Sequence, residues 1–207
     1  MKKPLNDFAI QNITEKIENL EKLSSIEFVP VYAHKSESYW GLRTFWFGFF
    51  VYVSQSFLKQ LWISNVLIAI IPLVIGIFVF WAFDRWSFLF DLLTLDRFVD
   101  RSVERAAREE FLASEIFATE KRTGVLIYIS KLERKVFVLA DKGLAKGTEQ
   151  EEWVQLGSEL AQAFSESKNV EATFCQALRK ISEKHAKDFP PEINNKNELQ
   201  NHPKFRK

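Results

Sequence analysis

Residues 44–58 (TFWFGFFVYVSQSFL) and 60–83 (QLWISNVLIAIIPLVIGIFVFWAF) are two uncharged apolar runs, and Lys59 separates them. As a helix the second run is about 36 Å long, enough to cross a hydrocarbon core of roughly 30 Å. The first run reaches a similar length if it begins near Trp40. We therefore predict a two-helix transmembrane hairpin over residues 41–84. A buried hairpin inside a soluble protein is the alternative.

The rest of the chain has the composition of a soluble protein. The whole chain of 207 residues carries 28 basic and 27 acidic side chains, for a formal net charge of +1. This balance argues against a general nucleic-acid binder, which shows a basic excess. The single cysteine, Cys175, excludes an intrachain disulfide framework, and three scattered histidines give no zinc-ligand spacing.

Charged residues beside the apolar runs predict an orientation. The N-terminal residues are polar and lack the apolar core of a signal peptide. A hairpin crosses the membrane twice, so it leaves both chain ends on one side. The basic residues near the spans on that side are Lys35, Arg43, Arg85, Arg97 and Arg101, against Lys59 alone in the turn. The positive-inside rule then places both termini in the cytoplasm.

Four residues are predicted to lie at the membrane interface. Trp40 and Arg43 precede the first run, and Arg85 and Trp86 follow the second. Aromatic rings are enriched at headgroup level, and a long basic side chain can extend toward the headgroups. Residues 85–98 (RWSFLFDLLTLDRF) carry apolar side chains between charges, and Asp91 and Asp96 argue against a third span. They therefore predict an interfacial helix or a continuation of the second helix out of the membrane.

The two polar flanks predict one discontinuous α/β domain, formed by residues 5–40 and 99–190. Before the hairpin, helical periodicity covers residues 7–23, and IEFVPVYA (26–33) is typical of a strand in which Pro30 favours an edge position or a bulge. After it come a helix (99–121), strands TGVLIYIS and VFVLADKG, and helices over 151–167 and 170–189. Residues 191–207 are expected to be a disordered polar tail.

The order TGVLIYIS, LERK and VFVLADKGL, followed by a helix that begins near Trp153, resembles the second half of the TPM-domain family. Residues 8–33 resemble its first half, so the similarity covers about residues 5–40 and 100–190. Some bacterial members are similar in having a membrane hairpin that splits the domain. The resemblance implies a TPM-like α/β sandwich in a bacterial inner membrane. It also implies acid phosphatase activity, divalent metal binding, or the upkeep of membrane protein complexes.

Two departures from the family pattern bear on the phosphatase and metal properties. Thr123 stands where many members have Asn or Asp before the strand. The step over residues 140–145 (ADKGLA) replaces a glycine-rich segment that ends in Glu. Both departures weaken a direct transfer of those properties to this chain.

Asp141 and Glu149 are the candidate metal ligands. Asp141 ends a predicted strand in a turn with Gly143, where α/β folds often present ligands, and Glu149 adds carboxylate oxygens of the kind that calcium prefers. The alternative is an ordinary turn with solvated carboxylates. His34, His185 and His202 are expected to be solvated, and Cys175 to be a small core residue.

No general acid–base pair, nucleophile motif or complete metal set is visible in the sequence. We therefore expect a non-enzymatic protein that lies in the lipid bilayer and binds or assists other membrane proteins in assembly or maintenance. A divalent-metal-dependent, acid phosphatase-like hydrolase is the alternative.

Overall fold

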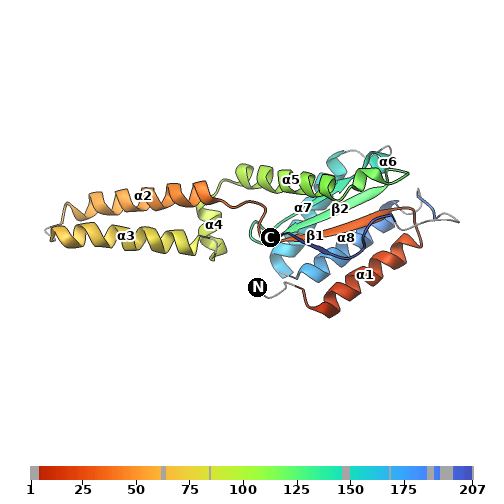
Figure 1. Ribbon diagram of the computed structural model, residues 1–207, viewed down its shortest axis with the longest axis horizontal. Helices are drawn as coiled ribbons and strands as arrows, with labels where there is room; N and C mark the ends of the chain where they lie inside the picture. Colours follow the sequence, from red (N-terminus) through yellow and green to blue (C-terminus); the bar gives the residue numbers. More distant parts are fainter. Residues whose placement is uncertain are drawn as a thin grey trace. The chain divides into compact units, whose positions relative to one another are not determined.

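The computed structural model describes residues 5–61, 64–83, 85–145, 150–167, 169–185, 189–191 and 198–206. The chain divides into two compact units, one formed by Met1–Ser36 with Asp100–Lys207 and the other by Glu37–Val99. The first, here the α/β unit, contains a sheet, and the second, here the helical unit, contains helices (Figure 1). Mixed α/β architecture is thus present, as the flanking sequences predict.

The sheet of the α/β unit has four strands in the order β3-β2-β1-β4. The strands are β1 (Glu27–Ala33), β2 (Gly124–Ser130), β3 (Lys135–Ala140) and β4 (Lys204–Arg206). β1 runs parallel to both β2 and β4, whereas β2 and β3 form an antiparallel hairpin. Every residue of β1 and β2 is buried, which requires cover on both faces of the sheet.

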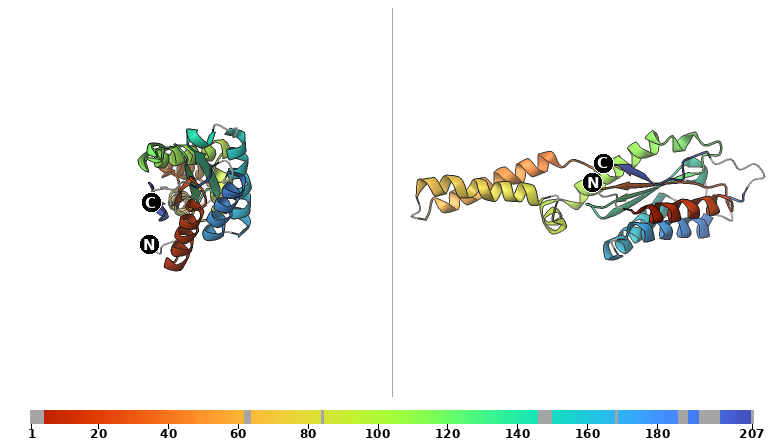
Figure 2. Two further views of the ribbon diagram at one scale, coloured as in Figure 1. Left: turned by 90° about the vertical axis from the view of Figure 1, so that its right-hand side faces the viewer. Right: turned by 60° about the horizontal axis from the view of Figure 1, so that its bottom comes forward.

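Helices supply that cover. One face carries α1 (Asp7–Glu21), α7 (Gln150–Ser167) and α8 (Val170–His185), and the other carries α5 (Asp96–Ala113) and the 3-10 turn η1 (Ile116–Ala118) (Figure 2). A short helix, α6 (Lys142–Ala145), follows β3. Ile13 and Ile17 of α1 pack with Phe28 of β1 and Ile127 of β2 in the main core. Alternation along the strands sends the other side chains toward α5.

Pro30 lies in β1 at a position where its missing N–H breaks no sheet hydrogen bond. The Glu27 N–H donates to the Thr123 carbonyl beside β2, so by alternation the nitrogens of Phe28 and Pro30 point away from β2. On that outer side β4 pairs only with Val31–Ala33, and Phe28 N–H donates to the Glu21 carboxyl instead. The edge position predicted from Pro30 is therefore observed over the first half of β1.

Residues 198–206 depart from the disordered tail expected over 191–207. Lys204–Arg206 form β4, and Asn201 is buried. Local composition gives no sign of this, because the segment is ordered by pairing with a strand about 170 residues earlier in the chain.

The helical unit consists mainly of α2 (Trp40–Leu58) and α3 (Asn65–Ala82), which pack side by side (Figure 1). Gly76 permits their close approach, since a Cβ there would lie 2.6 Å from a methyl of Val51 and 2.9 Å from the ring of Phe47. A separate short helix, α4 (Ser87–Leu93), follows. Residues 85–98 are thus not a continuation of α3, which ends before Phe83.

Candidate functional site

Asp141, the predicted metal ligand, lies buried at the end of β3 and faces an arginine. Its Oδ2 accepts from Arg122 Nε at 2.5 Å, and its Oδ1 accepts from Arg122 Nη2 at 2.9 Å and from the Lys142 N–H at 2.8 Å. This bond raises the pKa of Arg122. Both carboxylate oxygens therefore hold the loop before β2 against the turn after β3.

Gly143 allows the turn after β3 to pack closely against the loop that carries Arg122; this contact and the Arg122–Asp141 ion pair together are here called the clamp. A Cβ at this position would lie 2.3 Å from the Lys121 carbonyl oxygen and 2.5 Å from that of Arg122, so only glycine fits without moving the backbone. The Gly143 N–H donates to the Arg122 carbonyl at 2.8 Å. Arg122 itself has a φ of 58°, in the left-handed region. The turn is therefore built around the Arg122–Asp141 pair.

Glu149, the second predicted metal ligand, lies outside the described residues. Within the described ranges, no group of three or more His, Cys, Asp or Glu side chains is placed to hold a metal ion. Thr123, at the family's Asn or Asp position, donates from Oγ1 to the Ser25 carbonyl at 2.6 Å. The calcium site over Asp141 and Glu149 stays a prediction.

Two buried glutamates at the outer edge of β1 form an acidic pair that the sequence analysis missed. Glu21 accepts from the Phe28 N–H at 3.1 Å and from Asn201 Nδ2 at 2.6 Å. Burial, and then the charge of Glu27, raise the pKa of Glu21 to about 8. Burial also raises the pKa of Glu27, although backbone N–H groups of Glu198 and Leu199 donate to it. The sequence feature that could have revealed this pair is Glu27, a single acidic residue in the otherwise apolar segment 26–33.

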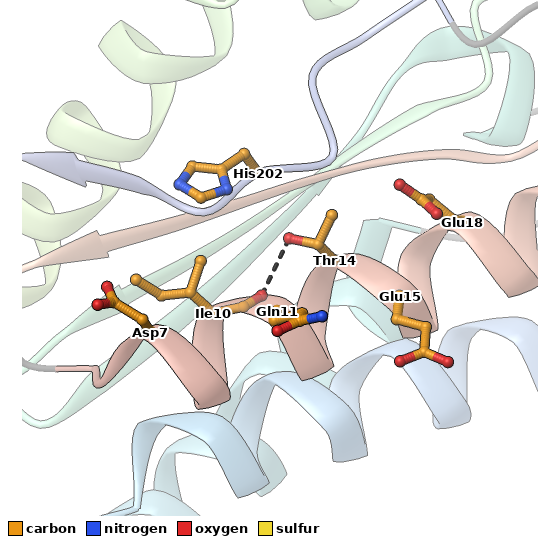
Figure 3. A pocket seen from close by; sticks show the side chains of 7 residues that line it. All are labelled: Asp7, Ile10, Gln11, Thr14, Glu15, Glu18 and His202. Atoms are coloured by element: carbon orange, nitrogen blue, oxygen red, sulfur yellow. Dashed lines mark hydrogen bonds between the residues drawn. The ribbon is translucent and has the colours of Figure 1, made fainter.

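A groove of about 500 Å³ follows α1 on its side nearest residues 198–206, here the β4 segment (Figure 3). Its lining includes Asp7, Glu15 and Glu18 of α1, and His202 lies across from the helix. Thr14 donates its hydroxyl to the Ile10 carbonyl at 2.9 Å within the helix. The lining is thus acidic, and its hydroxyl is engaged by the helix backbone.

A buried chain of hydroxyl groups lies where β1 and β2 end. Tyr128 Oη is 3.3 Å from Ser36 Oγ, which is 3.0 Å from Ser130 Oγ, and Ser130 donates to the Glu133 carboxylate. The Ser36 N–H also donates to Glu133 at 2.8 Å. These bonds fix the point at which the chain leaves the sheet toward residue 37. All four side chains are buried, so their role is structural.

The histidines and the cysteine divide between exposed and buried positions. His34 and His202 are exposed as predicted, but His185 is buried and stacks on Trp153 with ring centroids 4.9 Å apart. The prediction of a solvated His185 is wrong, because the end of α8 packs against α7. Cys175 is half-buried.

The interface residues of the sequence prediction lie near one end of the α2–α3 pair. Arg43 Nη2 donates to the Phe80 carbonyl at 2.8 Å, and its guanidinium lies 4.1 Å from the Phe80 ring centre. Trp40 meets the same ring edge-on at 5.3 Å, and Arg85 lies 5.7 Å from the Trp81 ring. Arg43 therefore links α2 to α3. Trp86 packs edge-on against Phe78 at 5.5 Å.

Among the described residues, one helix, α3, is long and apolar enough to cross a membrane by length and composition. α2 is one residue longer but carries Arg43, Thr44, Ser54, Gln55 and Ser56, and it does not meet the same criterion. Large apolar side chains are exposed on both helices, among them Phe45, Tyr52, Phe57, Val66, Val74 and Ile77. The pair thus presents an apolar outer surface.

Comparison with known proteins identifies a similar fold and no family. No family model matches the chain, and no curated protein matches it. The NMR structure of BA42 protein from the psychrophilic bacteria Bizionia argentinensis sp. nov. matches with a TM-score of 0.61 and 16% sequence identity, over 100% of this chain and 98% of that one. At this identity the likeness bears on the fold alone.

Proposed function

We propose that the protein is an integral membrane protein whose TPM-like α/β domain is anchored by two spans, α2 and α3. The observation that carries the proposal is the apolar outer surface of the α2–α3 pair, where Tyr52 is 71% and Val66 65% exposed. Soluble monomers rarely expose contiguous apolar patches of this kind, and lipid is the solvent that suits them.

The pairing of β1 with β2 supports an even number of crossings. These strands are hydrogen-bonded neighbours over seven residue pairs, so the segments before and after the helical unit belong to the same side of the membrane. If α3 crosses, a second segment must return the chain, and α2 is the described helix that adjoins it. The basic residues at the flanks, against Lys59 alone in the turn, favour a cytoplasmic α/β domain and cytoplasmic termini.

The protein acts, in this proposal, as a non-enzymatic binding factor in the assembly or maintenance of bacterial inner-membrane proteins. Anchoring keeps the α/β domain near the bilayer, which raises its encounter rate with membrane partners. The alternative, a divalent-metal-dependent hydrolase, rests on Asp141 and the TPM resemblance. Arg122 already occupies both oxygens of that carboxylate, so a metal would have to displace a bidentate ion pair.

Membrane topology is tested by cysteine labelling in a Cys175→Ser background. Lys59→Cys places a thiol in the turn, and Glu183→Cys places one on an exposed position of α8, where the side chain is 67% exposed. An impermeant maleimide should label Lys59→Cys in intact cells and Glu183→Cys only after lysis. Labelling of both sites in intact cells, or extraction of the protein by alkaline carbonate, would overturn the anchored topology.

The choice between binding and hydrolysis is tested on the purified protein. We expect no phosphomonoester hydrolysis that depends on added Ca²⁺ or Mg²⁺. We also expect Asp141→Asn to lower the free energy of unfolding by about 1 kcal/mol, because it breaks the clamp on Arg122. Metal-dependent turnover that disappears in Asp141→Asn would establish the hydrolase instead.

A further inference from the structure

The β4 segment (198–206) covers part of the outer edge of β1 with a short strand that buries little apolar surface. Its strand is three residues long, and Lys204–Arg206 pair with Val31–Ala33. Phe205 supplies the apolar side chain of this strand, yet it is 37% exposed and meets Tyr32 edge-on at a centroid distance of 6.2 Å. Strands with little buried apolar surface open at low free energy relative to the core.

Polar contacts hold the opposite face of β4 against α5. Lys204 and Arg206 are two positions apart and therefore point the same way. Lys204 Nζ donates to Ser114 Oγ at 2.9 Å, while Arg206 donates to the Ala106 carbonyl at 2.9 Å and to the Glu109 carboxylate at 2.6 Å. α5 and Ser114, the residue that follows it, thus offer acceptors for two basic side chains at alternate positions of an extended strand.

Buried polar atoms without partners gather along the same edge. Within the described residues six buried side-chain atoms lack a hydrogen-bond partner, and three of them lie here: Glu27 Oε2, Tyr32 Oη and Asn201 Oδ1. Buried polar groups in folded proteins are nearly always paired, so the β4 segment fits this edge imperfectly. Tyr32 in particular lies beside Phe205, whose side chain offers no acceptor.

We infer that the outer edge of β1, between α1 and α5, is a binding site for an extended segment of a membrane-protein partner, with the β4 segment as its internal occupant. The bound segment runs parallel to β1 and carries basic residues two positions apart for α5. Between them it has a hydrogen-bonding side chain, which pairs with the Tyr32 hydroxyl. This inference rests on the proposed binding function and names its surface and ligand class.

The tether of the β4 segment sets the conditions for binding. A covalently linked occupant competes at an effective concentration of the order of millimolar. A partner therefore binds well only if it fits the edge better than Lys204–Arg206 does, or if the internal strand is weakened. Substitution of Arg206 weakens the strand without touching the edge of β1.

The direct test uses labelled peptides and the full-length protein in detergent. The first peptide has the sequence of residues 201–207, NHPKFRK, and the second carries the equivalent of Phe205→Asn. Anisotropy titrations compare the wild type with Arg206→Ala and with Arg206→Ala combined with Glu109→Lys. We expect the Asn peptide to bind Arg206→Ala about tenfold more tightly than it binds the wild type, and more tightly than NHPKFRK does. Adding Glu109→Lys should weaken the binding of the Asn peptide to Arg206→Ala by about tenfold.

Two outcomes would overturn the inference. One is the absence of saturable binding to Arg206→Ala, and the other is binding that Glu109→Lys leaves unchanged. Amide hydrogen exchange on the wild type provides a test that needs no substitution. Amides of residues 204–206 should exchange well before those of β2, and exchange of β4 only on global unfolding would show that the segment is not displaceable.

Peptide binding and membrane anchoring are measured independently, so either proposal can fail without the other. A protein that labels as predicted at Lys59→Cys but binds neither peptide would retain its membrane anchor and lose the binding site. A protein that binds the Asn peptide but is extracted by alkaline carbonate would retain the site and lose the anchor.

Discussion

The two units of the molecule place their apolar side chains in opposite ways. In the α/β unit, Ile13, Ile17 and Phe28 are fully buried, whereas in the helical unit Tyr52 and Val66 are mostly exposed. Polar groups of the helical unit bond inward: Ser54 donates to the Phe50 carbonyl, and Trp46 Nε1 donates to the Leu93 carbonyl. The contrast is the one expected between a domain that folds in water and helices that lie in lipid.

Two valines of nearly equal exposure, one in each unit, provide the most direct test of whether the two units face different solvents. Val74 of α3 is 59% exposed and Val154 of α7 is 56% exposed. In lipid, lysine near the middle of a span costs about 3 kcal/mol of insertion free energy, whereas a lysine on a solvated helix costs little. Val74→Lys should therefore reduce the fraction of protein found in membranes, and Val154→Lys should leave it unchanged.

The measurement is the distribution of each variant between membrane and soluble fractions, together with its steady-state amount. Equal behaviour of the two variants would mean that both valines face the same solvent. The proposed anchor would then fail, whatever the result for the α/β unit.

Packing between α2 and α3 is tested by a matched pair of glycines. A Cβ at Gly76 would lie within 3 Å of Val51 and Phe47, whereas a Cβ at Gly48 of α2 meets nothing within 4 Å. Gly76→Leu should destabilise the pair by about 2 kcal/mol through overpacking. Gly48→Leu should change the thermal stability in detergent micelles very little, and a similar loss in both variants would contradict this packing.

The α/β unit should show a pH dependence that originates in Glu21. Its folded pKa of about 8 lies above the ordinary value of 4.5, so the folded chain keeps a proton that the unfolded chain releases between these values. Stability should fall by about 1 kcal/mol between pH 6 and pH 7. The charged groups that raise the Glu21 pKa are the carboxylates of Glu27 and Glu18.

Glu21→Gln removes this titration and keeps one acceptor oxygen for the Phe28 N–H, but it replaces the oxygen that accepts from Asn201 with an NH2 donor. Denaturant unfolding across pH 5 to 8 should show a steep decline for the wild type and a flatter profile for Glu21→Gln. Parallel profiles for the two proteins would show that Glu21 is ionised in the folded state.

Much of the fold follows from local patterns in the sequence. The strands expected at 26–33, 123–130 and 136–143 correspond to β1, β2 and β3, and the helices expected at 151–167 and 170–189 correspond to α7 and α8. Apolar runs bounded by turn residues specify such elements because both faces of this sheet are covered. The separation of α4 from α3 was left open, since charges every few residues suit either arrangement.

The features that the sequence did not predict depend on contacts between distant segments. β4 has no strand pattern of its own, and Glu21 and Asn201 meet across 180 positions of the chain. Asp141 was predicted to be a ligand from its place after a strand, but the arginine that holds it comes from the loop before the preceding strand.

The insertion of the helical unit between two neighbouring parallel strands has a consequence for biosynthesis. β1 is synthesised before the helical unit, but its partner β2 emerges about ninety residues later. At 5–20 residues per second this is a delay of roughly 5 to 20 s. During that time an apolar strand has no sheet to join, so its completion waits until α2 and α3 have left the ribosome. In the proposed membrane-anchored protein, targeting would then precede folding, and a chain that missed the membrane would be marked by an unpaired β1 as well as by exposed helices.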